Sequence, residues 1–326
     1  IQAPMAYITW ADLAAAVSNA GGLGTMGPNP GPGFQEEMPD VEQAGELLRQ
    51  EIRRLRDMTR KPFAVNFTIG RGKQIPYSDR FVEVGCEEKV PVAVVSMGSS
   101  SVYTEKLRAA GCKVLHAVGG VSHAIRAQAD GVDAIVCEGF EGGGHLGGEE
   151  LTTLVMVPQI ADVVDIPLVA GGGIADARGM VAALALGAEG IYMGTRFMVA
   201  TECSIHINVK QAVVDATDTS TVAFGRNVML SRSLKNKYTQ EHMALEAKGA
   251  SFEEMRNYER SGTPSLKGRR RSAAANVDGN LEYGSVGMGA IAGFIKEISG
   301  AADIVNGLVQ GSPGVIQRLQ EVIPTP

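Results

Sequence analysis

The sequence predicts an α/β protein: a (β/α)8 barrel of the TIM type with an appended, mainly helical C-terminal region. Short apolar runs without charged residues alternate with stretches of helical period along residues 1–197. Such runs are typical of strands buried on both faces of a parallel sheet, and their alternation with helices indicates repeated βα units. Eight strands can be counted, which is the barrel number and favours a barrel over an open, doubly wound sheet.

The elements of the predicted barrel follow one another in a regular order. Gly111, Gly131 and Gly187 each end a helical stretch directly before an apolar run, where glycine supplies the left-handed residue that terminates a helix. The predicted strands are 1–4, 23–25, 63–68, 92–96, 113–118, 133–137, 167–170 and 190–193. The predicted helices, which have apolar residues at i, i+3 and i+4, are 42–58, 101–110, 121–130, 154–164 and 176–187.

Residues 198–326 are expected to form the helical region, packed on the barrel of residues 1–197. The stretch 205–260 is polar, helical in period and poor in strand signals. The stretch 261–280 carries the basic run 267–271 among Ser, Gly and Pro, which predicts an exposed loop. A glycine-studded segment, 284–293, precedes a closing helix.

Composition and charge exclude several classes of protein. The 30 basic and 36 acidic residues give a net charge of −6, which argues against a general nucleic-acid binder. No apolar run is long enough to predict a membrane span, and the four cysteines show no zinc or disulfide spacing. We therefore expect a cytoplasmic protein with reduced thiols and a small-molecule substrate. The sequence is compatible with a monomer or a homodimer. The chain starts at Ile1 without a signal-peptide pattern, which suggests that a few leading residues are absent.

Glycine gathers in the loops that follow the last two predicted strands. Gly171, Gly172 and Gly173 follow the seventh strand, and Gly194 and Thr195 follow the eighth. Both loops open helices, where unpaired backbone N–H groups bind phosphate, and barrels commonly build their phosphate site from these two loops. Glycines that only make tight turns are the alternative. Two such loops at consecutive positions favour a ligand that carries phosphate.

The loop after the sixth strand, 138–148, contains a histidine among glycines that allow close approach to a flat ligand. An imidazole that titrates near neutral pH suits proton transfer, so His145 is the predicted catalytic residue. A surface or structural histidine is the alternative. His116, at the end of the fifth strand, is a second candidate for the same mouth, whereas the other three histidines lie in helical stretches.

Six motifs, in order over nearly the whole chain, are specific in combination. They are QAPM (2–5), SNAGGLGTMG (18–27), KPFAVNFT (61–68), EGFEGGGHLGG (138–148), IPLVAGGGIADARG (166–179) and LGAEGIYMGTRF (186–197). Together they resemble the FMN-dependent nitronate monooxygenase family, formerly the 2-nitropropane dioxygenases. Relatives of that family include flavin-dependent enoyl-ACP reductases and a bacterial NADH:quinone reductase.

The resemblance implies a TIM barrel with FMN at its mouth, and His145 as the active-site histidine. This histidine belongs to the family's AGGH motif, which is GGGH (142–145) in this chain. Gly142 replaces the usual Ala, which leaves more room beside the flavin. The residues implied to hold the phosphate are Gly171, Gly172, Gly173, Gly194 and Thr195. The residues implied to lie along or face the flavin are Ala3, Pro4, Met5, Asn66, Glu138, Gly143 and Gly144.

Subfamily signals conflict. Monooxygenases of the family often carry Gln at position 138, whereas the enoyl reductases carry Glu, as this chain does. GTRF (194–197) and GSVGMGAIAG (284–293) also favour the reductases, while QAPM and SNAGGLG favour the monooxygenases, and GFE (139–141) is similar to the quinone reductase.

Three functions follow from these signals. We expect a nitronate monooxygenase, in which an alkyl nitronate reduces FMN and O2 reoxidises it. The alternative is a reductase that passes electrons from NAD(P)H through FMN to an enoyl-ACP or a quinone. In that case the basic run 267–271 meets an acidic carrier or a 2′-phosphate; otherwise it is a solvated loop. A non-catalytic flavin- or sugar-phosphate-binding barrel is the third hypothesis.

Overall fold

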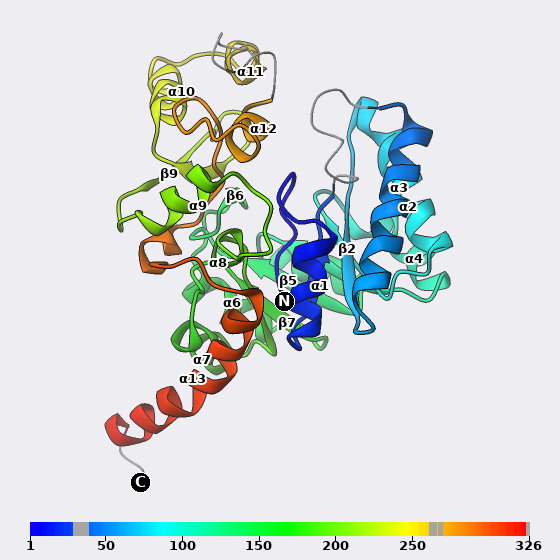
Figure 1. Cartoon of the computed structure of the whole chain (residues 1–326), viewed down its shortest axis with the longest axis vertical. Helices are drawn as coiled ribbons and strands as arrows, with labels where there is room; N and C mark the ends of the chain where they lie inside the picture. The colour runs from blue at the N-terminus through cyan, green and yellow to red at the C-terminus, as the bar shows by residue number, and fades with distance from the viewer. Residues whose placement is uncertain (29–38, 261–265, 267–269, 324–326) are drawn as a thin grey trace.

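Residues 1–28, 39–260, 266 and 270–323 are described by the computed structural model, a barrel with a cap at one end (Figure 1). Seven parallel strands form one curved sheet in the order β1-β2-β3-β4-β5-β7-β8. The N-terminal segment closes this sheet, because Gln2 forms a bridge with Met193 after β8 and its amide donates to Leu23 O before β1. The predicted (β/α)8 barrel is thereby confirmed. The strands are β1 (Gly24–Met26), β2 (Phe63–Thr68), β3 (Val92–Ser96), β4 (Lys113–Val118), β5 (Ala134–Glu138), β7 (Leu168–Gly171) and β8 (Gly190–Tyr192).

Helices alternate with the strands around the barrel, although the helices at Ala11–Asn19 and Ile75–Glu87 were not among the predicted helical stretches. The glycines at 111, 131 and 187 have φ of +89°, +81° and +101°, so each supplies the left-handed residue expected between a helix and the next strand. The helices of the barrel are α1 (Ala11–Asn19), α2 (Val41–Met58), α3 (Ile75–Glu87), α4 (Thr104–Ala109), α5 (Val121–Ala129), α6 (Thr153–Ala161), α7 (Ala177–Ala185) and α8 (Thr195–Met198).

Side chains alternate between two hydrophobic layers. Ala64, Val94 and Leu115 belong to the barrel interior, whereas the residues next to them pack against the helices. His116 follows Leu115 and its register partners are Val95 and Ile135, both of the outer layer. His116 therefore points away from the barrel interior, and the suggestion that it faces the mouth is wrong.

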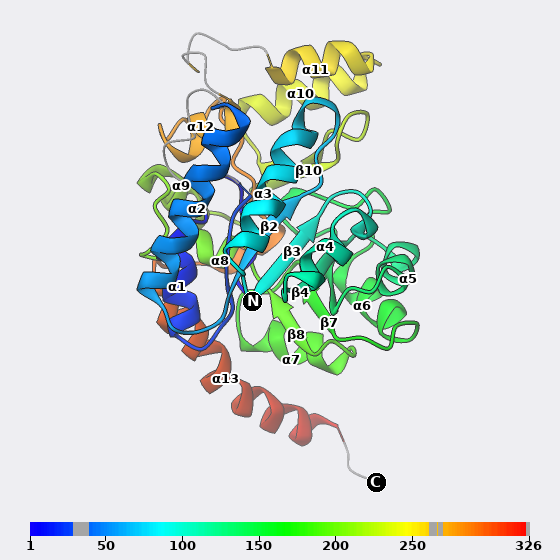
Figure 2. The same cartoon turned by 90° about the vertical axis from the view of Figure 1, so that its right-hand side faces the viewer.

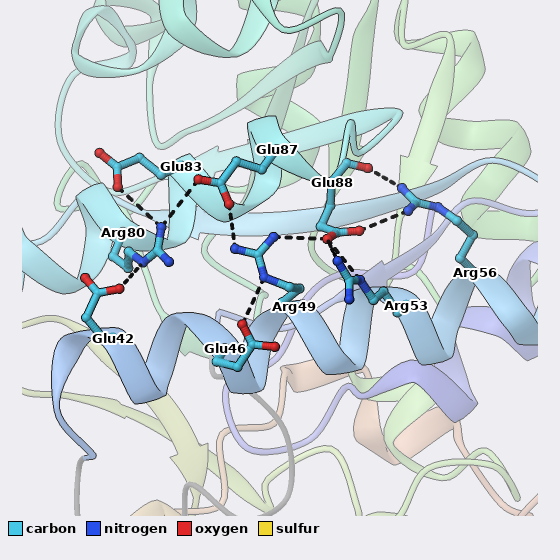
Figure 3. A network of polar contacts seen from close by, with 9 residues as sticks. All are labelled: Glu42, Glu46, Arg49, Arg53, Arg56, Arg80, Glu83, Glu87 and Glu88. Carbon is cyan, nitrogen blue, oxygen red and sulfur yellow. Dashed lines mark hydrogen bonds and ion pairs between the residues drawn. The ribbon is translucent and has the colours of Figure 1, made fainter.

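An ion-pair network joins α2 to the end of α3 (Figure 3). Arg49, Arg53 and Arg56 of α2 converge on the Glu88 carboxylate, with nearest N–O distances of 3.0, 2.8 and 3.2 Å. The Glu88 side chain is only 8% exposed. Burial works to raise its pKa, but the hydrogen bonds from the arginines outweigh burial and hold the pKa below its ordinary value. The carboxylate is therefore ionised and fixes one helix to the other.

The chain beyond α8 is mainly helical but also contains a sheet that sequence reasoning missed. Strands β9 (Thr221–Phe224) and β10 (Ser231–Leu234) pair antiparallel, and β10 also pairs with the two-residue β6 (Gly144–His145) from the barrel's own loop. Short, half-polar strands of this kind give little signal in isolation. The helices of this region are α9 (Ile207–Val214), α10 (Lys237–Ala247), α11 (Phe252–Arg260), α12 (Arg271–Asn276) and α13 (Ala301–Val322).

We call β6, β9, β10, α10, α11 and α12 the cap, which stands at one end of the barrel, whereas α13 extends away from the opposite end (Figures 1 and 2). The sheet of the cap begins in the loop after β5, so the cap is tied directly to the barrel mouth. Among the described helices, none is long and apolar enough to cross a membrane.

The predicted exposed loop 261–280 is only partly described, because 261–265 and 267–269 lie outside the described residues. Arg271, the last residue of the basic run, begins α12 and is only 6% exposed. Its guanidinium lies 4.3 Å and 4.9 Å from the ring centres of Tyr238 and Tyr258 and donates to backbone carbonyls. The prediction of a solvated loop is therefore wrong at Arg271, whose charge is used inside the cap.

Candidate functional site at the barrel mouth

The carboxyl ends of the last three strands place one row of residues at the mouth. Glu138 of β5 pairs in register with Gly171 of β7, and Gly171 pairs with Tyr192 of β8. Tyr192 belongs to the barrel interior, and residues in one row share a face, so Glu138 points inward as well. A Cβ on Gly171 would lie 3.3 Å from the Tyr192 ring. The missing side chain therefore gives the ring its space.

Glu138 is a carboxylic acid held in a poorly solvated position. Burial raises the pKa of its side chain from 4.5 to about 7. Burial, followed by the charge of Glu138, also raises the pKa of Tyr192 well above its ordinary value. At neutral pH a large part of the Glu138 population is protonated and can donate a hydrogen bond, which an ionised carboxylate cannot do.

Gly142 explains how this carboxyl fits. A Cβ at this position would lie 2.4 Å from Glu138 Oε1. The alanine expected from the family motif would therefore require the end of the Glu138 side chain to shift. The room gained by the glycine is occupied by the Glu138 carboxyl.

Asn66 lies on the inner face of β2, because its register partner is Val94 of the barrel interior. Its Nδ2 donates to Val94 O at 2.8 Å and to Ser96 Oγ at 3.1 Å, and its Oδ1 accepts from Thr68 Oγ1 at 3.3 Å. These bonds fix the amide at the carboxyl end of the strand. Asn66 and Glu138 thus contribute polar groups to the mouth from β2 and β5.

The two glycine loops offer backbone donors. The amides of Gly172, Gly173 and Thr195 make no hydrogen bond to any residue that the structure describes. Thr195 Oγ1 accepts from Gly289 N at 2.9 Å, which leaves its own hydroxyl proton free to donate. The expectation that the N-terminus of α7 contributes bare amides is wrong, because the Asp176 side chain accepts from the amides of Arg178 and Gly179.

Gly172 and Gly194 have different roles in these loops. A Cβ on Gly172 would lie 2.8 Å from Thr153 Oγ1 and 3.0 Å from the backbone of Gly139, so this glycine is required by packing within the protein. A Cβ on Gly194 would meet only Met5 Sδ at 3.6 Å and Ala3 Cβ at 3.7 Å, which are ordinary contacts. A side chain at Gly194 would therefore point towards the N-terminal segment and touch it without a clash.

That N-terminal segment runs from the barrel interior to the mouth. Ala3 belongs to the barrel interior and its amide donates to Met193 O at 2.8 Å. Met5 is half-buried, and its backbone is fixed by Thr9, whose Oγ1 accepts from Met5 N at 3.0 Å. Pro4 is half-buried between them. The three residues therefore run past Gly194, where Ala3 and Met5 lie within van der Waals distance of the Cβ position.

Two residues that sequence reasoning missed hold these loops together. Thr153 Oγ1 lies 3.2 Å from Gly171 O and 3.0 Å from Gly172 O, and the Glu141 carboxylate accepts from Thr153 N at 2.9 Å. The loops after β5 and β7 are therefore joined at the first turn of α6. The threonine–glutamate pair has no signal in the sequence, because the bonds cross between separate loops.

His145 is in β6, where its register partner is Ser231 of β10. Gly143 brings this strand close to the C-terminal region, since a Cβ there would lie 2.5 Å from Gly289 N. Desolvation lowers the pKa of His145, although its side chain is partly exposed to solvent, and the charge of Glu259 offsets part of the effect. The ring is therefore mainly neutral at pH 7.

The residues of the mouth are chemically compatible with FMN. Unbonded amides and a threonine hydroxyl suit a phosphate, and the polar side chains of Asn66 and Glu138 suit a flat, polar ring system. Among the described residues, no group of His, Cys, Asp and Glu could hold a metal ion.

Comparisons with known proteins agree with this reading. The family model for nitronate monooxygenase matches residues 1–311. The chain is similar to FabK from Thermotoga maritima (36% identity, 99% of this chain and 95% of that one, TM-score 0.86). It is also similar to nitroalkane oxidase from Streptomyces ansochromogenes (26% identity, 98% and 96%, TM-score 0.81).

A curated relative from Rhodococcus jostii, a (3aS,4S,5R,7aS)-5-hydroxy-7a-methyl-1-oxo-octahydro-1H-indene-4-carboxyl-CoA dehydrogenase, is 30% identical over 338 residues and covers 95% of this chain and 91% of its own. The family match over nearly the whole chain, the barrel and the arrangement of the mouth lead to one conclusion: this chain belongs to the nitronate monooxygenase family and is a flavin-dependent oxidoreductase.

Proposed function

We propose that this protein uses FMN to oxidise alkyl nitronates and the nitroalkanes from which they form, with O2 as the final electron acceptor. The observation that carries the proposal is the position of His145 in β6, seven residues after Glu138 in the loop that follows β5, together with the desolvation that lowers the pKa of its imidazole. A neutral imidazole can accept a proton, whereas an imidazolium cannot.

One set of residues at the mouth would bind the phosphate of FMN, and another set would contact its isoalloxazine ring. The amides of Gly173 and Thr195 would hold the phosphate, together with the Thr195 hydroxyl. Ala3, Pro4 and Met5 would lie along one side of the isoalloxazine. Asn66 and Glu138 would contact its polar edge, and the protonated Glu138 would donate a hydrogen bond there. When bound, FMN accepts an electron pair from the substrate and transfers it to O2.

His145 would act on the substrate. A nitroalkane loses a proton from the carbon that bears the nitro group; the C–H bond breaks, its electron pair remains on the substrate, and an N–H bond forms on the imidazole. The resulting imidazolium stands beside the nitronate anion and holds it by charge and hydrogen bond. A nitronate supplied directly needs only the second of these roles.

Glu138 favours a second candidate, an NAD(P)H-dependent reductase of thioesters. The family resemblance associates Glu at this position with the enoyl-ACP reductases. The similarity to two relatives over nearly the whole chain, FabK and the carboxyl-CoA dehydrogenase, also favours a thioester substrate. In this case the protonated Glu138 keeps its role towards FMN, and His145 orients the acceptor.

One anaerobic experiment separates the two. FMN-loaded protein is mixed without O2 with nitroethane, ethyl nitronate, NADH or NADPH, and the visible absorption of the flavin is followed. We expect both nitro compounds to bleach the flavin, with His145→Ala much slower for nitroethane than for ethyl nitronate. Rapid bleaching by NADH or NADPH alone, with neither nitro compound reacting, would establish the reductase instead.

A further inference from the structure

Thr153 lies where the loops after β5 and β7 meet. It is the first residue of α6, and its side chain is buried. Its Oγ1 lies 3.2 Å from Gly171 O, 3.0 Å from Gly172 O and 3.0 Å from Glu141 Oε2. The three oxygens compete for one proton, because a threonine hydroxyl donates only one hydrogen. The oxygen that receives this proton determines how Thr153 acts on the loop after β7.

Two of the three oxygens have another donor. Both oxygens of the Glu141 carboxylate accept from the backbone amide of Thr153, at 3.1 and 2.9 Å. Gly171 O accepts from the amide of Gly139 at 3.0 Å. Among the described residues, the Thr153 hydroxyl is the only donor to Gly172 O. A partly buried carbonyl without a donor costs free energy, so the hydroxyl proton is directed to Gly172 O.

This contact orients the backbone of the loop. A trans peptide is planar, and its N–H points away from its C=O. Because Thr153 Oγ1 contacts the carbonyls of Gly171 and Gly172, the amides of Gly172 and Gly173, which belong to the same two peptides, point away from Thr153. The left-handed φ of +93° at Gly172 and +69° at Gly173 allows two successive peptides to turn in this way.

The side to which the Gly172 amide points is that of β8. In the sheet, β7 lies between β5 and β8, and Gly171 O is directed to the β5 side, where Gly139 donates to it. The amide of the same peptide, that of Gly172, is therefore directed to the β8 side. In the loop after β8, the Thr195 amide also lacks a hydrogen bond to any described residue, and the Thr195 hydroxyl can donate. Successive unbonded amides of this kind suit the oxygens of a phosphate.

We propose that Thr153 is a positioning residue whose hydroxyl holds the carbonyl of Gly172 and thereby directs the amides of Gly172 and Gly173 towards the phosphate of FMN. The proposal rests on the binding of FMN at the mouth, proposed above, and does not depend on which substrate is oxidised. Thr153 acts through the backbone of the loop and contributes no group of its own to the flavin.

A comparison of FMN with riboflavin tests this role, because riboflavin has the same ring system and ribityl chain but no phosphate. The affinity of the flavin-free protein for each flavin is measured by fluorescence titration. Thr153→Val replaces the hydroxyl by a methyl group of similar size, and Thr153→Ser keeps the hydroxyl. Thr152→Val is the matched control, since Thr152 is exposed and its side chain does not cap α6.

We expect Thr153→Val to bind FMN about tenfold more weakly and to bind riboflavin within about twofold of the wild type, because only the contact with the phosphate is weakened. The preference for FMN over riboflavin should therefore fall about tenfold. Thr153→Ser and Thr152→Val should keep the wild-type preference.

An unchanged preference for FMN in Thr153→Val would overturn the proposal. Equal losses of affinity for FMN and riboflavin would also overturn it, since they would indicate a general disturbance of the mouth. A loss in Thr153→Ser as large as that in Thr153→Val would show that the hydroxyl is not responsible. If Thr153→Val does not fold, Thr153→Ala removes the same hydroxyl without adding bulk and is judged by the same outcomes.

Failure of the proposed function would give a different result. A wild-type protein that binds neither flavin, or binds both equally, would refute the phosphate site at the mouth and the role of Thr153 with it. A wild-type protein that prefers FMN, with the preference preserved in Thr153→Val, would refute the role of Thr153 alone.

Discussion

Replacing Glu138 by Gln should stabilise the flavin-free protein, and the gain should depend on pH. Glu138 binds its proton more tightly in the folded state than in the unfolded state, because burial raises its pKa from 4.5 to about 7. Between these values the folded state binds more protons, so its stability falls as pH rises. Below about pH 4.5 the carboxyl is protonated in both states and carries no such penalty.

The size of the effect follows from the two pKa values. Their difference corresponds to about 3 kcal/mol of unfolding free energy above pH 7. Glutamine has the same shape and stays neutral, so it removes this penalty. Water that reaches the mouth reduces the effect, and we expect Glu138→Gln to gain about 2–3 kcal/mol at about pH 8.5 and close to nothing at about pH 4.5.

Urea unfolding of the flavin-free protein at these two pH values measures the difference directly. Glu253→Gln, at an exposed site, should change the unfolding free energy little at either pH and serves as the control. An equal gain at both pH values would refute the reasoning, because a neutral effect of packing would then be responsible. A loss of stability at the higher pH would show that Glu138 is ionised and paired in the folded state.

Three further predictions concern the cofactor, the catalytic histidine and the outer helices. Gly194→Ala should fold normally but bind FMN at least about tenfold more weakly, because its methyl group enters the space that faces Ala3 and Met5. Flavin fluorescence titration measures the affinity, and Gly307→Ala on α13 is the control. An unchanged affinity would place the phosphate elsewhere. His145→Ala should retain FMN and lose about 10²–10⁴-fold in kcat/KM for nitroethane in steady-state kinetics, and wild-type rates would make it a structural residue. Glu88→Gln should lower the unfolding free energy at pH 7 by about 1–2 kcal/mol, because three arginines lose the carboxylate with which they pair. The lowered pKa of Glu88 contributes stability that is lost as pH falls through it, so the difference between variant and wild type in urea unfolding should shrink in acid. A difference that does not depend on pH would contradict this explanation.

The barrel could be predicted from the sequence because its signals are local. Each strand is a short apolar run, and each glycine that ends a helix lies directly before the next strand, as at Gly111 and Gly187. The glycine loops after β7 and β8 could be placed at the mouth for the same reason, since strand ends in a parallel barrel share one edge. Glu138 was assigned to the mouth only through the family resemblance, because the apolar run of β5 is buried on both faces and shows no alternation.

The cap and its contacts could not be predicted, because they depend on residues far apart in the chain. β9 and β10 are short and half-polar, and β6 becomes a strand only by pairing with β10. Asp176 uses its side chain to close the N-terminus of α7, which no glycine pattern indicates. Arg271 was interpreted as part of a basic loop because the tyrosines that enclose it, Tyr238 and Tyr258, precede it by 33 and 13 positions.

The flavin content of the purified protein shows whether the barrel mouth binds FMN. The protein is purified, incubated with FMN and FAD together, freed of unbound flavin and denatured, and the released flavin is identified by chromatography and counted against protein. The arrangement of Thr195, Gly173 and Glu138 at the barrel mouth predicts one FMN per chain and no FAD. Protein that retains no flavin, or that retains FAD in preference to FMN, would contradict the account.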